Sequence, residues 1–550
     1  MANSSQQNTN LSEEQVIPSQ EKHNLSRSIS IATVIMMGSV FLSRITGMLR
    51  EVTLANIGGT SSEMDAYVAA FLIPELLNHF LAGGFLSVTF IPIFQKYLVK
   101  NDYNEAWKVF SNLITIGTAA FALFLPLSIL LAPYFLSLTG LKEQDPQTFA
   151  LTVRLTRIIL PAQMFFYWGA FLMAVQYARQ RFFLPALAPL CYNLGIICGG
   201  IFLGPRFGIE GFAWGVLIGA FAGNVAVQLP GVLKIGMRYS FRFSLRDPEF
   251  SRYVKITIPL VAGLGMTFSN EIFFRYFASF LESGAVASAN YALRTMMILV
   301  GVFGQASGVA FYPYLSKLAA EKAYTKMTEL LNSMITRIAL YLIPLSAIMI
   351  ALAPQIILIL YEHGRFTEES TRETVPVLIA YLFGAFAASV SILAARPFYA
   401  MQKTLLPMII STTVSLISIP LYYIFSKLMG AAGLGLASSA AMTTQFIILY
   451  TIWGKRYGGL QAAPKEILKL MKIVLTSAAG ALLCFVISKQ LESFIISDIK
   501  RVQAIFICIC ASVPSLAFVF FIYEILKLQK LRDSIDGLLR RRKSAVNNVA

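Results

Sequence analysis

Two arginines and a glutamate interrupt an apolar stretch near the amino terminus of this 550-residue chain. The apolar run 31–42 leads without a turn signal into Arg44, Gly47, Arg50 and Glu51. An arginine near the centre of a bilayer costs from ~3 to more than ~10 kcal/mol, so it normally faces a polar cavity or a partner. On a helix, positions 44, 47 and 50 fall within a sector of about 120°. The spacing therefore predicts one cationic helix face.

Two interpretations of this face stay open on the sequence. In the first, Arg44 and Arg50 anchor an anionic ligand inside the membrane, and Gly47 leaves a gap where the ligand can approach the backbone. In the second, one arginine extends to the membrane interface or pairs internally with Glu51.

The composition indicates which kind of protein must hold these charges. Hydrophobic residues make up 56% of the chain, charged residues make up 13%, and the mean hydropathy is +0.66. This balance is typical of an all-α integral membrane protein. The net charge of +17 does not indicate a nucleic-acid partner, because the basic residues lie in short loops between apolar segments.

Metal and catalytic motifs are not found in the sequence. The five cysteines lie in apolar segments without the spacing of a zinc site, and there are only three histidines. We find no phosphate-binding glycine loop and no nucleophile motif. We therefore expect a protein that is not an enzyme and that holds no metal and no cofactor.

Fourteen segments are long and apolar enough to span a bilayer, since each span needs ~20 residues. They are 29–55, 65–96, 109–136, 148–178, 183–203, 210–233, 255–281, 285–316, 328–360, 373–400, 405–426, 433–453, 468–488 and 503–527. Residues 1–28 are polar and are predicted to be a disordered tail. Basic residues gather in alternate loops and in the tail 529–550, so the positive-inside rule predicts that both termini are cytoplasmic.

The sequence resembles itself at an offset of 221–224 residues. Leu131-Ala132-Pro133 matches Leu352-Ala353-Pro354, and Gly208-Ile209-Glu210-Gly211 matches Gly430-Ala431-Ala432-Gly433, with three further matches in the same order. We infer two parallel six-helix lobes, 29–235 and 255–455, around a central cavity. Residues 467–528 have no counterpart and form two additional helices. In parallel repeats of this kind, the substrate site lies between the halves.

If the cavity lies between the lobes, its charges come from the early spans of each lobe. Besides Arg44, Arg50 and Glu51, the candidates are Asp65, Asn78, His79, Glu271, Arg275, Arg294 and, more weakly, Arg157. Arg294 has no acidic neighbour in the sequence, which favours a functional role.

Four of these candidates also have a structural interpretation. Glu271 and Arg275 have the i,i+4 spacing of a helical salt bridge. Asp65 suits a helix cap, and His79 beside Asn78 suits a hydrogen-bonded core residue. Several arginines around one cavity favour a phosphate or pyrophosphate, because guanidinium binds such anions in a bidentate fashion. A cation exporter would instead require carboxylates in its spans, and this chain has few.

The first two spans resemble the MurJ/MviN family, the bacterial lipid II flippases of the MOP superfamily. The resemblance rests on Ser43-Arg44-x-x-Gly47-x-x-Arg50-Glu51, on Asp65-Ala66-Tyr67 and on Pro74-x-Leu76-Leu77. It continues through Arg294 and Tyr361-Glu362-x-Gly364-Arg365-Phe366-Thr367, and it covers most of residues 30–530.

The resemblance implies an inner-membrane flippase that moves undecaprenyl-pyrophosphate-linked peptidoglycan precursor from the cytoplasmic to the outer leaflet. It implies alternating access driven by the membrane potential or a monovalent ion, with Arg44, Arg50 and Arg294 in a central cavity and Asp65 as a functional acid. It also implies a groove for the lipid tail in 467–528. The implied partners are lipid II, membrane lipids and the cell-wall synthesis or division machinery.

One departure from the family pattern concerns the residues after Pro74-x-Leu76-Leu77. Familiar members place an arginine there, whereas this chain has Asn78 and His79. A protonated His79 or the additional Arg275 replaces that charge in our interpretation. The alternatives are a flippase for another polyprenyl-linked oligosaccharide, a multidrug exporter of the same superfamily, or a non-transporting scaffold.

Overall fold

The structure is a computed structural model that describes residues 19–81, 86–137, 145–265, 276–278, 280–401, 403–458, 463–494 and 499–528. All regular elements in these residues are helices, so the predicted fold class is confirmed. Ten helices in the described residues are long and apolar enough to cross a membrane. The four other predicted spans, 29–55, 65–96, 255–281 and 405–426, are charged, broken or only partly described.

The N-terminal lobe contains the helices from α1 to α12. They are α1 (Ser19–Gly58), α2 (Ser62–Ala70), α3 (Leu72–Leu81), α4 (Leu86–Val99), α5 (Tyr103–Ser137), α7 (Pro146–Ile159), α8 (Ala162–Ala178), α9 (Phe183–Cys198), α10 (Gly204–Phe207), α11 (Glu210–Phe221) and α12 (Gln228–Leu233). α1 begins before the predicted span, so residues 19–28 belong to this helix, and residues 1–18 lie outside the described residues.

The predicted span 65–96 is a set of separate helices. The Ser61 hydroxyl accepts a hydrogen bond from the Met64 backbone N–H and so caps the start of α2. α2 ends at Ala70, and α3 resumes after Phe71 with Pro74 in its first turn. Proline lacks the N–H that would bond the carbonyl of residue 70, which weakens the helix at this point. This break separates the polar start of the span from its apolar second half.

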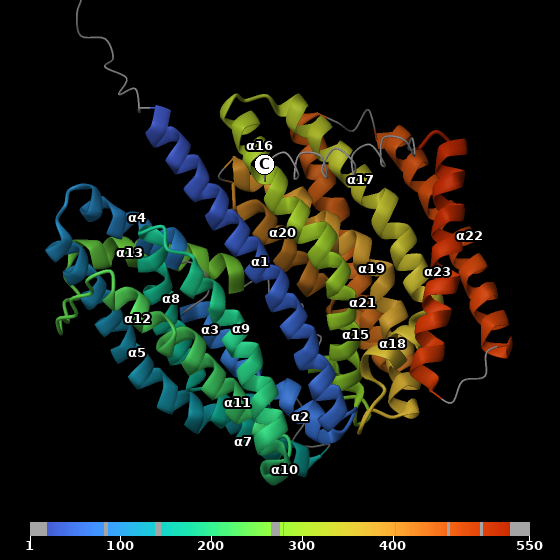
Figure 1. Ribbon diagram of the computed structural model, residues 1–550, viewed down its shortest axis with the longest axis horizontal. Coiled ribbons are helices and arrows are strands. Elements are labelled where there is room, and N and C mark those ends of the chain that lie inside the picture. Colours follow the sequence, from blue (N-terminus) through green and yellow to red (C-terminus); the bar gives the residue numbers. More distant parts are fainter. Residues whose placement is uncertain are drawn as a thin grey trace, which may run out of the picture.

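The C-terminal lobe repeats the boundaries of the first. It contains α13 (Pro248–Gly265), α15 (Ala285–Leu299), α16 (Ala306–Ala320), α17 (Tyr324–Ala351), α18 (Ala353–Tyr361), α19 (Glu368–Ala400), α20 (Leu405–Ile417) and α21 (Ile419–Tyr457). Of these helices, α13 packs chiefly against α3, α4 and α5 of the N-terminal lobe and lies beside α4 in Figure 1. Left-handed turns recur at equivalent places, with φ of 57° at Asn101 and 54° at Lys322, and with φ of 59° at Gly208 and 58° at Gly430. These pairs lie at the offset that the sequence repeat predicts.

The two lobes lie side by side, with α1 between them (Figure 1). The additional helices α22 (Ala463–Phe494) and α23 (Lys500–Ile525) pack on the outer side of the C-terminal lobe, against α17 and α18. The Gln355 side-chain amide donates to the Glu492 carboxylate at 2.6 Å, and the Thr336 hydroxyl donates to Glu466 at 3.0 Å. Lys500 and Arg501 of α23 add contacts with Glu368 and with the Glu362 carbonyl, so polar contacts at several points fix the additional pair against the lobe.

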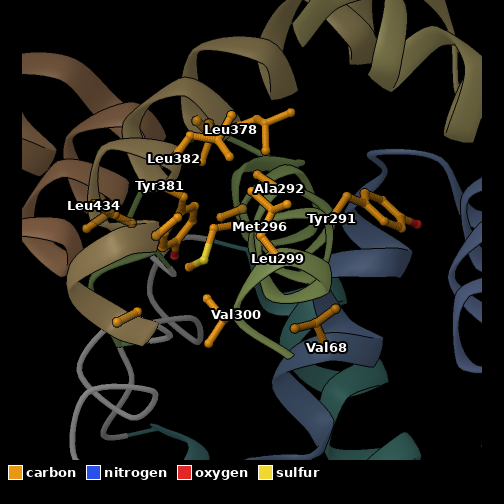
Figure 2. Packing of buried hydrophobic residues seen from close by; sticks show 14 of the residues in the cluster. Val68, Tyr291, Ala292, Met296, Leu299, Val300, Leu378, Tyr381, Leu382 and Leu434 are labelled. Carbon is orange, nitrogen blue, oxygen red and sulfur yellow. The ribbon is translucent and has the colours of Figure 1, made fainter. Parts of the chain in front are cut away.

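One buried core continues from the N-terminal lobe into the C-terminal lobe. Figure 2 shows α15 at its centre, with Tyr381 and Leu382 of α19 on one side and Val68 of α2 on the other. The Tyr291 hydroxyl on α15 donates to the Gly59 carbonyl at 3.2 Å, which ties this core to the end of α1.

The lobes meet at a seam near the end of α1, formed by Asn56, Gly59 and Thr60 on one lobe and Gly284, Gly364, Arg365 and Ser370 on the other. The Arg365 N–H donates to the Asn56 carbonyl at 2.8 Å, and the Thr60 and Ser370 hydroxyls are 2.7 Å apart. All three glycines have φ between 57° and 89°. A Cβ at any of them would overlap backbone or side-chain atoms of the opposite lobe. The backbones can therefore approach closely only because these residues are glycine.

Candidate functional site

A cavity of about 360 Å³ lies beside the C-terminal part of α1. The N-terminal lobe supplies most of its wall through α1, α2, α3, α8, α9 and α11, and the C-terminal lobe supplies α15. Its lining residues are Arg50, Glu51, Leu54, Tyr67, Val68, Phe71, Glu75, Gln163, Phe166, Tyr192, Ile196, Val216, Asn290 and Arg294. The structure thus brings together Arg50, Glu51 and Arg294 of the predicted site.

The Glu51 carboxylate lies at the centre of the polar contacts. Arg50 donates to Glu51 Oε1 at 2.6 Å, Arg294 Nε lies 3.8 Å from the same oxygen, and Asn290 donates to Oε2 at 3.5 Å. Glu51 is 4% exposed, whereas the Arg294 side chain is 43% exposed. Arg294 therefore has both an internal counter-ion and an open side that can meet an incoming anion.

Asn193 of α9 fixes the orientation of Arg50. Its amide oxygen accepts from Arg50 Nη1 at 3.1 Å, and its amide nitrogen donates to the Ser43 carbonyl at 3.2 Å. A Cβ at Gly47 would lie 3.6 Å from that nitrogen, so the Asn193 side chain covers this glycine. The Asn193 side chain therefore lies in the space beside Gly47 that the sequence interpretation assigned to a ligand.

Arg44 reaches the C-terminal lobe. Its Nη2 donates to the Gln305 side-chain carbonyl at 2.8 Å, and its guanidinium lies directly over the Cα of Gly301. Both partners belong to a π-helical turn, Val300–Gln305, between α15 and α16. The wider winding of this turn brings Gly301 and Gln305 toward α1. Arg44 thus joins the two lobes about 9 Å along α1 from Arg50.

Gly301→Ala should displace Arg44, because the new methyl group would occupy the position of the guanidinium. We expect transport of the native substrate to fall about tenfold, since a charge-assisted hydrogen bond contributes about 1.5–3 kcal/mol. The measurement is the transport rate per folded protein in vesicles. Gly38→Ala on α1 is the matched control, because nothing lies within 4 Å of a Cβ there. A rate equal to that of the control would contradict this assignment.

Asp65 caps a helix of the other lobe. Its carboxylate accepts from the Gly284 N–H at 2.6 Å and from the Ala287 N–H at 2.7 Å, at the start of α15. Asp65 is buried, and its charge complements the positive end of the α15 dipole. The cap that the sequence suggested for its own helix is made by Ser61 instead. Asp65 therefore positions Asn290 and Arg294, which follow on α15.

The remaining predicted residues lie elsewhere. Arg157 is exposed on α7, and its Nε donates to the Ile129 carbonyl of α5 at 3.2 Å. The described lining of the cavity does not include Arg44, Gly47, Asp65 or Arg157. Asn78 and His79 belong to α3, but their side chains lie outside those that the structure describes, as do Glu271 and Arg275 entirely.

The sequence interpretation missed Glu75, Gln163, Tyr192, Asn193, Asn290 and Gln305. A signal existed for some of them, because Asn193 and Gln305 are polar residues within apolar spans, and Glu75 follows the helix-breaking Pro74. Among the described residues, no three His, Cys, Asp or Glu side chains are grouped as a metal site requires. The site is therefore a mixed array of guanidinium, carboxylate and amide groups.

Comparison with known proteins relates this arrangement to one family. The family model described as lipid II flippase MurJ matches residues 54–505. A probable lipid II flippase MurJ from Thermotoga maritima is 28% identical over 440 residues, which are 80% of this chain and 86% of that protein. The lipid II flippase MurJ of Burkholderia cenocepacia is 28% identical over 441 residues, covering 79% and 85% of the two chains.

Solved structures show the same relationship in three dimensions. A lipid II flippase MurJ in an inward closed conformation aligns with a TM-score of 0.73 and 26% identity, covering 90% of this chain and 99% of that one. A multidrug resistance MATE transporter of the MOP superfamily, in an inward-facing conformation, aligns with a TM-score of 0.65 at 14% identity. It covers 78% of this chain and 99% of its own, and shares the fold.

Proposed function

The chain belongs to the MurJ family of lipid II flippases, multi-pass membrane transporters, and we propose that the pyrophosphate of lipid II binds between Arg44, Arg50 and Arg294. The observation that carries this proposal is the exposed Arg294 side chain beside Glu51 in a cavity between the lobes. Guanidinium groups match phosphate oxygens in charge and in geometry. Glu51, Asn193 and Gln305 hold these groups in the absence of substrate.

The proposed cycle uses the geometry of the seam. With the lobes joined at the end of α1, the headgroup enters from the face that carries the basic loops. Binding of the pyrophosphate competes with Glu51 for Arg294, which weakens a contact between the lobes. The lobes then rotate about the bound headgroup, and the protein carries out no chemical step. The driving force is the membrane potential or a monovalent ion.

Several further assignments belong to the same proposal. The domains are the N-terminal lobe, which begins with α1 and ends at residue 235, the lobe 255–455, the additional pair 467–528 and the tails 1–18 and 529–550. The lipid tail lies in the bilayer beside α22 and α23, in a groove of that pair. Both termini are cytoplasmic in the bacterial inner membrane, and the cell-wall synthesis or division machinery is the partner.

The test is transport by the purified full-length protein in vesicles that contain fluorescent lipid II in one leaflet. We expect protein-dependent movement of lipid II, competition by other pyrophosphate-linked polyprenyl glycolipids, and no competition by cationic drugs. Growth of a bacterium depleted of its own flippase should be restored by this chain. Drug efflux without lipid II movement would contradict the proposal.

His79→Ala should lower transport more than Arg275→Ala if His79 supplies the charge that replaces the family's arginine. Because an unperturbed histidine has a pKa of ~6.5, transport by the unaltered protein should also rise as the pH falls through that range. The measurement is the vesicle transport rate of both variants between pH 5.5 and 8, a range chosen to span about one unit on either side of that value. Loss of activity in Arg275→Ala alone would assign the compensating charge to Arg275.

A further inference from the structure

The segment that joins the two lobes has no regular secondary structure, and its sequence alternates between large apolar and polar residues. In residues 237–247, four large apolar side chains at every second position are exposed, namely Tyr239, Phe241, Phe243 and Leu245. Phe241 is 81% exposed. Arginines at 238, 242 and 246 alternate with them. We call residues 237–247 the strap.

The strap is held in place by buried polar residues of α5. Asn112 makes two hydrogen bonds with the backbone of Ser244, donating to its carbonyl at 3.0 Å and accepting from its N–H at 2.8 Å. The Ser240 N–H donates to Ser111 at 3.1 Å, and the Thr115 and Tyr239 hydroxyls are 2.9 Å apart. Asn112 is 1% exposed. The apolar side chains are therefore presented by an ordered backbone.

The attachment points lie at the level where the bilayer core begins. α5 has 35 residues and is about 52 Å long, whereas the hydrocarbon core is about 30 Å thick. Its first turns carry Glu105 and Lys108, and its apolar run starts at Leu113, directly after Asn112. Ser111 and Thr115 thus lie at the boundary between headgroups and acyl chains.

The strap also lies on the lipid-facing side of the lobe. Leu123 and Leu130 follow Asn112 by 11 and 18 positions. Because each residue of a helix turns by about 100°, all three side chains point in directions within about 20° of one another around the α5 axis. Leu123 and Leu130 are both exposed, as expected for side chains that contact acyl chains. In Figure 1 the linker after α12 lies on the outer edge of the N-terminal lobe, beside α5.

The charges of the strap are predominantly positive. Residues 234–247 contain four basic residues and a single acid, Asp247, which lies 3.3 Å from Arg242. The adjacent Glu249 is buried, but hydrogen bonds from Lys96 and Tyr97 lower its pKa below the usual value, so it stays ionised and paired with Lys96 at 2.6 Å. Arg246 is exposed, and within the described residues Arg238 makes a long contact of 3.4 Å with Asn104.

We propose that the strap is a binding surface for anionic phospholipid in the leaflet on the basic-loop side. Tyr239, Phe241, Phe243 and Leu245 insert among the parts of the acyl chains next to the headgroups, and Arg238, Arg242 and Arg246 bind the lipid phosphates. Aromatic side chains favour the membrane interface, and each basic residue there attracts anionic lipid. The depth and the lipid-facing position favour a membrane over a soluble protein partner. The proposal is independent of the substrate of the flippase.

The test uses Phe241→Trp as a local reporter in vesicles that contain either brominated phosphatidylglycerol or brominated phosphatidylcholine. Bromine on the acyl chains quenches only a tryptophan that is close to them, and the signal of the four native tryptophans is subtracted using the unaltered protein. We expect strong quenching by the brominated lipids, stronger for phosphatidylglycerol, and little quenching by aqueous iodide.

The charges are tested by adding Arg238→Gln, Arg242→Gln and Arg246→Gln to the reporter. The preference for phosphatidylglycerol should fall about fivefold or more, the factor that one basic residue contributes near an anionic surface. Lys317→Gln, Lys322→Gln and Lys326→Gln, in exposed positions of the C-terminal lobe, should leave it unchanged. Each variant is first shown to elute as a folded monodisperse species. Quenching of the reporter by iodide but not by brominated lipid would then overturn the proposal. A preference for phosphatidylglycerol that survives the three arginine changes would also overturn it.

Discussion

Arg294→Ala should lower the rate of lipid II translocation by about 100-fold. The change removes a guanidinium that is open to the cavity, and a charge-assisted contact of this kind contributes about 1.5–3 kcal/mol. It also removes a cationic neighbour of the buried Glu51, because Arg294 Nε lies 3.8 Å from the Glu51 carboxylate. The measurement is the initial rate in vesicles, normalised to folded protein. Arg294→Lys should retain part of the rate, because an ammonium keeps the charge but not the bidentate geometry.

The matched control for Arg294 is Arg372→Ala. Arg372 is exposed at the start of α19 and forms a surface pair with Glu369 at 3.6 Å, so its removal should change transport less than twofold. If Arg294→Ala inserts normally and transports at the rate of Arg372→Ala, then Arg294 does not bind the headgroup.

Gly364→Ala should open the seam. A methyl group at this position would overlap the Asn56 carbonyl, the acceptor of the Arg365 N–H, and the φ of 60° adds about 1 kcal/mol for a residue with a Cβ. We expect a shift of at least about tenfold toward conformations in which the lobes are apart at this end. The measurement is the distance between spin labels at Phe207 and Glu369, after replacement of the native cysteines by serine.

Gly430→Ala is the control that separates the overlap with Asn56 from the backbone strain caused by a positive φ. Gly430 has a φ of 58°, which is nearly the same backbone strain, but nothing lies within 4 Å of a Cβ there. The control should therefore lower stability slightly without changing the label distances. Equal distance distributions in the two variants would show that the Gly364 contact does not hold the lobes together.

The sequence predicted the fold class and the cationic face because both depend on local pattern. An apolar run interrupted by Arg44 and Arg50 requires a polar environment wherever the helix packs. The repeat makes α15 the counterpart of α2, and the early spans of both lobes were expected to line the cavity, which led to Arg294 as a candidate. Turns such as those at Gly208 and Gly430 recur because the same local backbone geometry is encoded twice.

The partners across helices could not be predicted from periodicity. A helix pattern says which face of α1 is polar, but not that Asn193 would cover Gly47 or that Gln305 would accept from Arg44. Asp65 lies more than 200 residues from Gly284, and its role as a cap of α15 depends on how the lobes pack. The π-helical turn at Val300–Gln305 likewise has no signature in the spacing of its residues.

The Glu51 carboxylate has an electrical consequence for the proposed cycle. Arg44, Arg50 and Arg294 against Glu51 and Glu75 leave the empty site with a formal charge of plus one. A pyrophosphate diester carries one negative charge on each phosphate, so the loaded site would be negative. In a cell with a negative interior, outward movement of the loaded site and return of the empty site would both be favoured, by about 2.3 kcal/mol per charge for each 100 mV. Glu51→Gln would make the empty site more positive and the loaded site neutral. Voltage would then accelerate only the return step.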